Sequence, residues 1–260
     1  MKRIWQASLT AATLVALTAC GGGDDDDPAA PGTGTPTAVF RTFTADFSQK
    51  ADNWPGWASE SSDYTAGTAP TAVVFEQRQI PAPFGVPGYF ISGHNNSDDA
   101  FLYIKKQFTG LVASTDYTFT AQVNFVSGTP SGCVGVGGAP GESVYVIAAA
   151  SPTEPKAAAD STGYTKVNID RGNQGTPGAA SLVLGNIGNG QPCDGTTRYV
   201  SKSVRNTTGI KVKTDAEGKV WVLFGIDSGF EATSSVYLQN IIINFTPVTK
   251  IGRASCRERV

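Results

Sequence analysis

The sequence predicts an all-β protein built as an antiparallel β-sandwich, and three observations lead to this class. Short segments rich in β-branched and aromatic residues recur along the chain, and several alternate apolar with polar side chains. Turn-forming pairs such as Asn189-Gly190 and Asp194-Gly195 separate them. The sequence lacks the long helical patterns that connect parallel strands. About ten strands without such helices favour a sandwich, and the jelly roll is a common large form of it.

The strands differ in how clearly the sequence marks them. In Thr115–Phe125 (TDYTFTAQVNF) every second residue is apolar, which is typical of a strand with one buried face. Lys219–Ile226 is apolar on both faces and is predicted to be a central strand, and Ser234–Phe245 is long and rich in β-branched residues. Thr153–Asp160 (TEPKAAAD) is predicted to form one helical turn in a loop. Shorter strands are predicted at Val39–Phe47, Thr71–Glu76, Tyr89–Ser92, Ala100–Phe108, Ser143–Ala149, Tyr164–Ile169 and Ser181–Ile187.

Residues 1–19 have the features of an export signal, with a positively charged start (MKR) and an apolar stretch at Leu9–Ala19. An apolar stretch of about 11 residues is too short to cross a bilayer as a helix. The LTAC sequence at residues 17–20 resembles the bacterial lipobox, in which a peptidase cuts before a cysteine that carries diacylglycerol. The resemblance implies that Cys20 is lipidated. An ordinary signal peptide with an incidental cysteine is the alternative.

Residues 20–36 are predicted to be a flexible tether between the lipid and the folded domain. Its glycines give flexibility, Asp24–Asp27 repel one another, and its prolines oppose regular structure. Acyl chains on Cys20 would hold the protein at a membrane. By resemblance to the sorting rule of enterobacterial lipoproteins, Gly21 after the cysteine implies the outer membrane, with the domain facing the periplasm or the cell surface.

Residues 250–260 are interpreted as an artefact. Ile251–Val260 (IGRASCRERV) can be encoded by one reading frame of a common short-read sequencing adapter. Residues 37–249 are then expected to form a single β domain, which is long enough to bury a substantial core.

Without the leader and the tail, the chain has 14 basic and 21 acidic residues and a net charge of −7. No basic stripe or cluster is expected in the domain. Nucleic acids and anionic lipid surfaces attract proteins through such patches, so neither is predicted as a partner.

Cys133 and Cys193 are the two cysteines of the predicted domain. Two thiols do not complete a zinc site, and exported proteins meet an environment that oxidises thiols. A disulfide is therefore predicted, in preference to two free thiols or a metal site.

Two stretches of the domain resemble the galactose-binding-like jelly rolls, a group that includes many carbohydrate-binding modules. In FLYIKKQFTGLVASTDYTFTAQV, residues 101–123, a strand leads through Gly110-Leu111 into the next strand. SSVYLQNIIIN, residues 234–244, is similar to the last strand of that group, although Gln239-Asn240 stands where an aspartate is usual. The resemblance implies a jelly roll that binds a ligand, with glycans as the expected class.

Candidate ligand-binding residues follow from their chemistry. Trp54 and Trp57 lie on a Pro/Gly-containing loop (DNWPGW), where exposed rings stack on sugars; the alternative is that they cover the core. His94, Glu142 and Asp170 are the further polar candidates.

The resemblance also implies a structural calcium ion. Calcium binds six to eight oxygen atoms from carboxylates and carbonyls, and loops of this chain supply such groups. The predicted ligands are Asn95, Asp98 and Asp99 in one loop and Asp227 and Glu231 in another, with Asp46 near the first strand.

Two other functions compete with glycan binding. The first is an adhesion or structural lipoprotein that binds an envelope protein. The second is a hydrolase: the flanks of His94 and Ser228 do not fit a serine protease, but Glu142, Asp170, Asp227 and Glu231 are candidate carboxylates of a glycosidase if their loops converge. We expect a non-enzymatic protein with no cofactor other than calcium.

Overall fold

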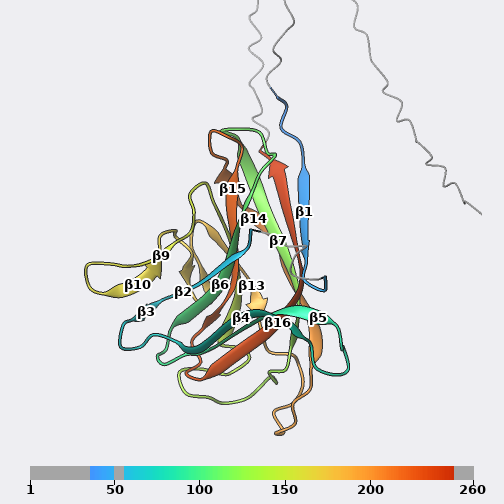
Figure 1. Cartoon of the computed structure of the whole chain (residues 1–260), viewed down its shortest axis with the longest axis vertical. Helices are drawn as coiled ribbons and strands as arrows, with labels where there is room; N and C mark the ends of the chain where they lie inside the picture. Colours follow the sequence, from blue (N-terminus) through green and yellow to red (C-terminus); the bar gives the residue numbers. More distant parts are fainter. Residues whose placement is uncertain (1–35, 50–55, 249–260) are drawn as a thin grey trace, which may run out of the picture. The chain divides into compact units, whose positions relative to one another are not determined.

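The structure, a computed structural model, describes residues 36–49 and 56–248, in which two large antiparallel β-sheets pack face to face and two small sheets of three and two strands accompany them (Figure 1). This part of the chain contains no helix, and hence none that is long and apolar enough to span a membrane. The signal sequence, Cys20, the tether up to residue 35, Trp54 and the tail lie outside the described residues.

Sheet A has the strand order β14–β7–β16–β5–β4. Strand β5 pairs with the first half of β16 and β1 pairs with its second half. The strands of sheet A are β1 (Arg41–Asp46), β4 (Thr71–Gln79), β5 (Pro87–His94), β7 (Asp116–Ser127), β14 (Val200–Lys213) and β16 (Thr233–Pro247).

Sheet B has the order β13–β8–β15–β6–β2. Its strands are β2 (Ala58–Ser62), β6 (Ala100–Phe108), β8 (Val144–Ser151), β13 (Ser181–Asn186) and β15 (Val220–Ser228). The chain passes back and forth between the sheets, since β5, β7, β14 and β16 belong to sheet A while β6, β8 and β15 belong to sheet B. The predicted antiparallel jelly roll is confirmed.

The main core fills the space between the two sheets. Strand β7 alternates between half-buried and buried residues, as predicted, and sends every second side chain inward. Strand β15 lies between β8 and β6 and supplies the opposite wall, which confirms it as a central strand. The core residues of these two strands are Tyr117, Phe119, Ala121, Val123, Phe125, Val220, Val222, Phe224 and Ile226.

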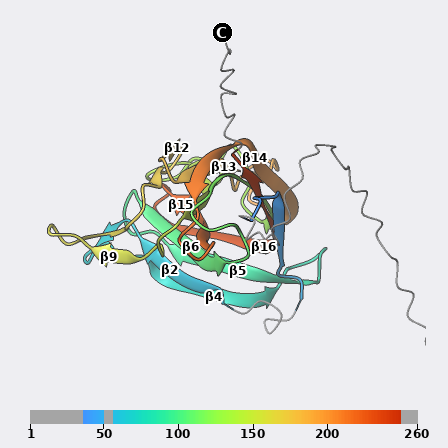
Figure 2. The same cartoon turned by 90° about the horizontal axis from the view of Figure 1, so that it is seen from above.

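Residues 152–180, here named the cover segment, lie over part of the outer face of sheet B. They contain β9 (Ala157–Ala159), β10 (Tyr164–Val167), β11 (Gly172–Asn173) and β12 (Thr176–Pro177), and β10 also pairs with β3 (Tyr64–Thr65). Figures 1 and 2 show β9 projecting past the β2 edge of sheet B.

The cover segment packs apolar side chains on sheet B. Val167 and the half-buried Ile169 join Phe101, Tyr103 and Leu223 in a second apolar cluster. Sheet B is therefore buried on both faces in this region, with the main core on its inner side.

Two local predictions were wrong. TEPKAAAD does not form a helical turn, because Ala157–Ala159 pairs with β10 as β9. The second error is the omission of β14 and β2, which are edge strands of sheets A and B and carry mostly polar side chains.

Candidate functional site

A pocket of about 220 Å³ lies where the edges of the two sheets meet, and Trp57 forms part of its wall. We name it the Trp57 pocket. The edges are held together by the rings of Phe43 in β1 and Phe108 in β6, whose centroids are 5.0 Å apart. The lining residues are Thr44, Ala45, Asp46, Gln49, Trp57, Lys106 and Phe108.

Trp57 is half-buried and has two roles. Its ring centroid lies 5.8 Å from that of Phe47, 6.2 Å from that of Phe108 and 6.4 Å from that of Phe224, so the core fixes its orientation. The rest of the ring lines the pocket. The sequence offered two interpretations of Trp57, a stacking surface or a cover for the core. In the structure Trp57 packs on the core and also presents an accessible aromatic surface.

Charged groups surround this aromatic surface. The Lys106 ammonium lies 5.9 Å from the Trp57 ring centroid and 5.8 Å from that of Phe108, within reach of cation–π attraction. Asp46 Oδ1 accepts hydrogen bonds from the backbone N–H and hydroxyl of Ser48 at 2.9 and 2.7 Å. These bonds lower the pKa of Asp46, so its carboxylate is ionised at neutral pH.

The structure does not bring the other predicted ligand-binding residues into this pocket. His94 ends β5, with Nδ1 3.2 Å from the Thr233 hydroxyl. Glu142 accepts the backbone N–H of Gly132 at 3.1 Å. Asp170 accepts two backbone N–H groups at the base of the β11–β12 hairpin. His94 thus contacts its partner on the neighbouring strand β16, and Glu142 and Asp170 stabilise loops.

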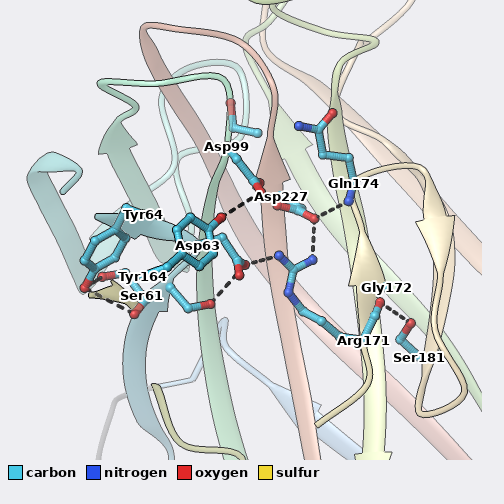
Figure 3. Close-up of polar contacts among 12 residues, drawn as sticks. Ser61, Asp63, Tyr64, Asp99, Tyr164, Arg171, Gly172, Gln174, Ser181 and Asp227 are labelled. Carbon is cyan, nitrogen blue, oxygen red and sulfur yellow. Dashed lines mark hydrogen bonds and ion pairs between the residues drawn. The ribbon is translucent and has the colours of Figure 1, made fainter. Parts of the chain in front are cut away.

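A cluster of ionisable groups lies between sheet B and the cover segment (Figure 3). Carboxylate oxygens of Asp63, Asp99 and Asp227 lie within 4.8 Å of one another. Arg171, from the cover segment, forms ion pairs with Asp63 and with Asp227, whose Oδ2 lies 2.5 Å from Nη1. The Arg171 guanidinium also lies 4.3 Å from the centroid of the Phe101 ring. We name these three carboxyl groups and Arg171 the Asp cluster.

Asp99 is the carboxyl group of this cluster that lacks an ion-pair partner among the described residues. Its Oδ2 accepts a hydrogen bond from the Tyr164 hydroxyl at 3.2 Å, while its Oδ1 and Asp227 Oδ1 are buried without a hydrogen-bond partner there. Burial, followed by the charge of Asp227, raises the pKa of Asp99 to about 7.

Asp227, unlike Asp99, has a cation and a backbone N–H donor beside its carboxylate. Burial raises the pKa of Asp227, but the Arg171 guanidinium and the backbone N–H of Gln174, 2.7 Å from Oδ2, oppose that rise. The net pKa of Asp227 is still raised, so these two neighbouring carboxyl groups hold a proton more readily than isolated aspartates do. Burial, followed by the charge that Asp99 carries once it is ionised, raises the pKa of Tyr164, which stays a hydroxyl donor.

Of the predicted calcium ligands, the structure brings together only Asp99 and Asp227. Asn95 is buried, and its Nδ2 donates to the carbonyls of Ser228 and Phe230 at 2.8 and 3.2 Å, so it stabilises the loop. Asp98 is exposed, Glu231 is outside the Asp cluster, and Asp46 lines the Trp57 pocket. Arg171 already binds two of the three clustered carboxylates, so the predicted ligand set is not assembled.

The Asp cluster also differs from a glycosidase site. Such enzymes place two carboxyl groups on either side of a bound sugar. Here Asp227 is 0% exposed, and Asp99 Oδ1 is buried. Glu142, Asp170 and Glu231 are not part of the cluster.

The predicted disulfide between Cys133 and Cys193 is confirmed, with a Cα–Cα distance of 5.3 Å. Beside it, Ser131 and Pro192 form an isolated β-bridge. The disulfide therefore joins the loop that follows β7 to the loop that precedes β14.

No protein-family model and no curated protein matches the chain. Among solved structures, it is similar to a carbohydrate-binding module studied for specific mannan recognition, with a TM-score of 0.38, 9% identity, and coverage of 82% of this chain and 100% of the other. The K3 cleaved adhesin domain of Lys-gingipain from Porphyromonas gingivalis gives a TM-score of 0.32 and 12% identity, over 77% and 97% of the two chains.

A third similar structure contains the CBM22-1 and GH10 modules of Clostridium thermocellum endo-1,4-beta-D-xylanase 10B in complex with xylohexaose. Its TM-score is 0.32 at 10% identity, over 79% of this chain and 28% of the xylanase chain. Similarities this distant carry no argument about function, which therefore rests on the residues of this chain.

Proposed function

We propose that this chain is a lipid-anchored protein of the cell envelope whose β-sandwich binds a glycan, without catalysis, in the Trp57 pocket. One observation carries the glycan part: Trp57 is fixed by core aromatic residues and still lines an open pocket. The anchor rests on the LTAC sequence ending at Cys20.

The Trp57 pocket offers the two kinds of contact that a sugar uses. The C–H face of a sugar ring packs on an aromatic surface, which Trp57 and Phe108 provide. Sugar hydroxyls both donate and accept hydrogen bonds. Lys106 can donate, the ionised Asp46 can accept, and the hydroxyl of Thr44 can do either.

Binding to a glycan array tests this proposal, with the purified full chain as the probe. We expect selective binding to neutral glycans that Trp57→Ala abolishes. Because Trp57 also packs on the core, Lys106→Gln and Asp46→Asn serve as second variants that leave the aromatic packing in place, and each should weaken binding. Phe40→Ala, which removes a ring that is 56% exposed outside the pocket, is the matched control.

Three results would overturn the proposal. They are no glycan binding by the wild-type chain, glycan binding that all three pocket variants retain, and conversion of a bound glycan to shorter products. Capture of a defined envelope protein through the Trp57 pocket, without glycan binding, would instead support the adhesion alternative.

A further inference from the structure

Strand β14 concentrates positive charge in a domain of negative net charge. It carries Lys202, Arg205, Lys211 and Lys213 and no acidic residue. Lys202 Nζ is engaged by the carbonyls of Asn186 and Gly188 at 2.7 and 2.6 Å. The other three basic side chains are exposed.

These three side chains share one face of sheet A. In the β14–β7 register, Arg205 pairs with Gln122, Lys211 with Thr118 and Lys213 with Asp116. Even-numbered residues of β7 point away from the core, and paired residues of antiparallel strands share a face. The absence of a basic stripe, expected from the sequence, is therefore wrong for this face.

Arg205 lies beside a second pocket of about 220 Å³, which we name the Arg205 pocket. Its lining combines a guanidinium with amide and hydroxyl groups and contains no carboxylate. The Arg205 side chain has no ion-pair or hydrogen-bond partner in residues 36–49 and 56–248. The lining residues are Thr120, Ala121, Gln122, Arg205, Asn206, Thr207 and Asn244.

A β-bulge fixes the wall of this pocket. The register of β14 shifts between Asn206 and Ile210, and Gly209 within the shift has a φ of +74°. Asn206 Oδ1 accepts the Gly209 N–H at 2.9 Å. A Cβ at Gly209 would lie 2.6 Å from Thr118 Cγ2, so the bulge packs closely against β7. On the other side of the pocket, Asn244 Oδ1 accepts the Thr42 hydroxyl at 2.8 Å.

We infer that the Arg205 pocket binds an oxyanion group, carboxylate or sulfate, that is carried by a polysaccharide. A guanidinium matches a planar or tetrahedral oxyanion with two parallel N–H groups. The amides and hydroxyls around it can bind the sugar hydroxyls beside that group. The positive charges continue to Lys213, whose partner on β7 is six residues from that of Arg205, a distance of about 20 Å. A row of cations of this length fits a polymer better than a single small anion.

Edge protection is the competing explanation. Strand β14 is an edge strand of sheet A, and exposed lysines on such strands prevent pairing with another chain. That explanation accounts for Lys211 and Lys213. It does not account for an unpaired arginine beside an amide-lined pocket.

Titration calorimetry of the purified full chain tests the inference with three polymers. Polygalacturonate carries carboxylates, dextran sulfate carries sulfates and dextran is neutral. We expect binding to at least one charged polymer and none to dextran, and the preferred polymer identifies the oxyanion. Arg205→Gln should weaken that binding about tenfold. The matched control Arg78→Gln, which removes an exposed arginine of sheet A that is paired with Glu76, should retain it.

Four results would contradict the inference. Failure of both charged polymers to bind would overturn the inference, as would equal binding by the wild type and Arg205→Gln. If a DNA duplex binds as tightly as the charged polysaccharide or more tightly, the ligand of this face is a nucleic acid and the inferred saccharide is wrong. If Arg205→Gln self-associates and still binds the polymer as the wild type does, the basic residues of β14 protect the sheet edge and do not bind the polymer.

Discussion

The pH dependence of stability tests whether the Asp cluster holds a proton. The pKa of Asp99 is raised from 3.8 to about 7, chiefly by burial and then by the charge of Asp227. Between these values the folded protein binds a proton at Asp99 that the unfolded chain has released. Stability is therefore greatest below about pH 4 with respect to this group, and it falls as the pH rises through 7.

The size of this effect follows from the shift. About three pKa units at 1.36 kcal/mol each give an upper limit of about 4 kcal/mol. Asp99 is partly exposed, and screening by water roughly halves the effect, so we expect the wild type to lose about 2 kcal/mol at this site between pH 4 and pH 8. In a domain of this size, that corresponds to a fall of about 4–8 °C in melting temperature.

Urea unfolding of the wild type and Asp99→Asn at pH 4 and pH 8 isolates the effect. Asparagine has the size of the protonated aspartate and does not titrate. The variant should match the wild type at pH 4 and exceed its free energy of unfolding by about 2 kcal/mol at pH 8. Asp98→Asn, at the exposed neighbouring position, is the control and should follow the wild type. Parallel loss of stability in the wild type and Asp99→Asn would refute the reasoning.

Three further predictions address the remaining expectations. Calcium must compete with the Asp99 proton, so any gain in melting temperature from millimolar calcium should grow from pH 5.5 to pH 8 and vanish in Asp99→Asn; identical curves in calcium and chelator at pH 8 would exclude a calcium site there. The double variant Cys133→Ala/Cys193→Ala should lose about 4 kcal/mol of unfolding free energy, since the disulfide spans 60 residues, and a loss below about 1 kcal/mol would contradict the loop-entropy argument. Radiolabelled palmitate should enter the full chain in a Gram-negative host, and Cys20→Ala should be released from membranes; equal membrane retention would contradict the anchor.

The fold could be predicted because its strongest signals are local. A strand with one buried face shows apolar residues at every second position, as in β7, and a central strand is apolar throughout, as in β15. Strand β14 lacked such a signal. It is an exposed edge strand with a bulge at Gly209, and only Val204 and Val212 of its 14 residues are buried.

The two site regions could be predicted only in part. Trp57 and Asp46 were recognised as candidates, but Lys106 and Phe108 join them only when β6 meets β1 at the edge of the sandwich. That meeting depends on the packing of the two sheets, which no local pattern encodes.

Asp99 and Asp227 were named as candidates, but their association with Arg171 and Asp63 in the Asp cluster was missed for a related reason. Arg171 pairs with Asp63 and Asp227 across 108 and 56 residues of sequence. One signal was available, however. Asp227 follows an apolar segment predicted to be a central strand, where a buried aspartate needs a cationic or hydrogen-bonding partner. Searching for that partner among the basic residues would have directed attention to Arg171.

The Asp cluster lies where the cover segment meets the apolar outer face of sheet B, and this position explains why charged groups are buried there. Phe101, Tyr103 and Leu223 make the outer face of sheet B apolar, and the cover segment shields it with few apolar contacts of its own. Buried ion pairs contribute little net stability, but losing one partner is costly, so they favour a single arrangement. Arg171 fixes the cover segment to β15 through Asp227 and to the β2–β3 turn through Asp63. Ionisation of Asp99 places a second negative charge beside Asp227 in that contact. The attachment of the cover segment therefore depends on pH, whereas the main core depends on apolar packing.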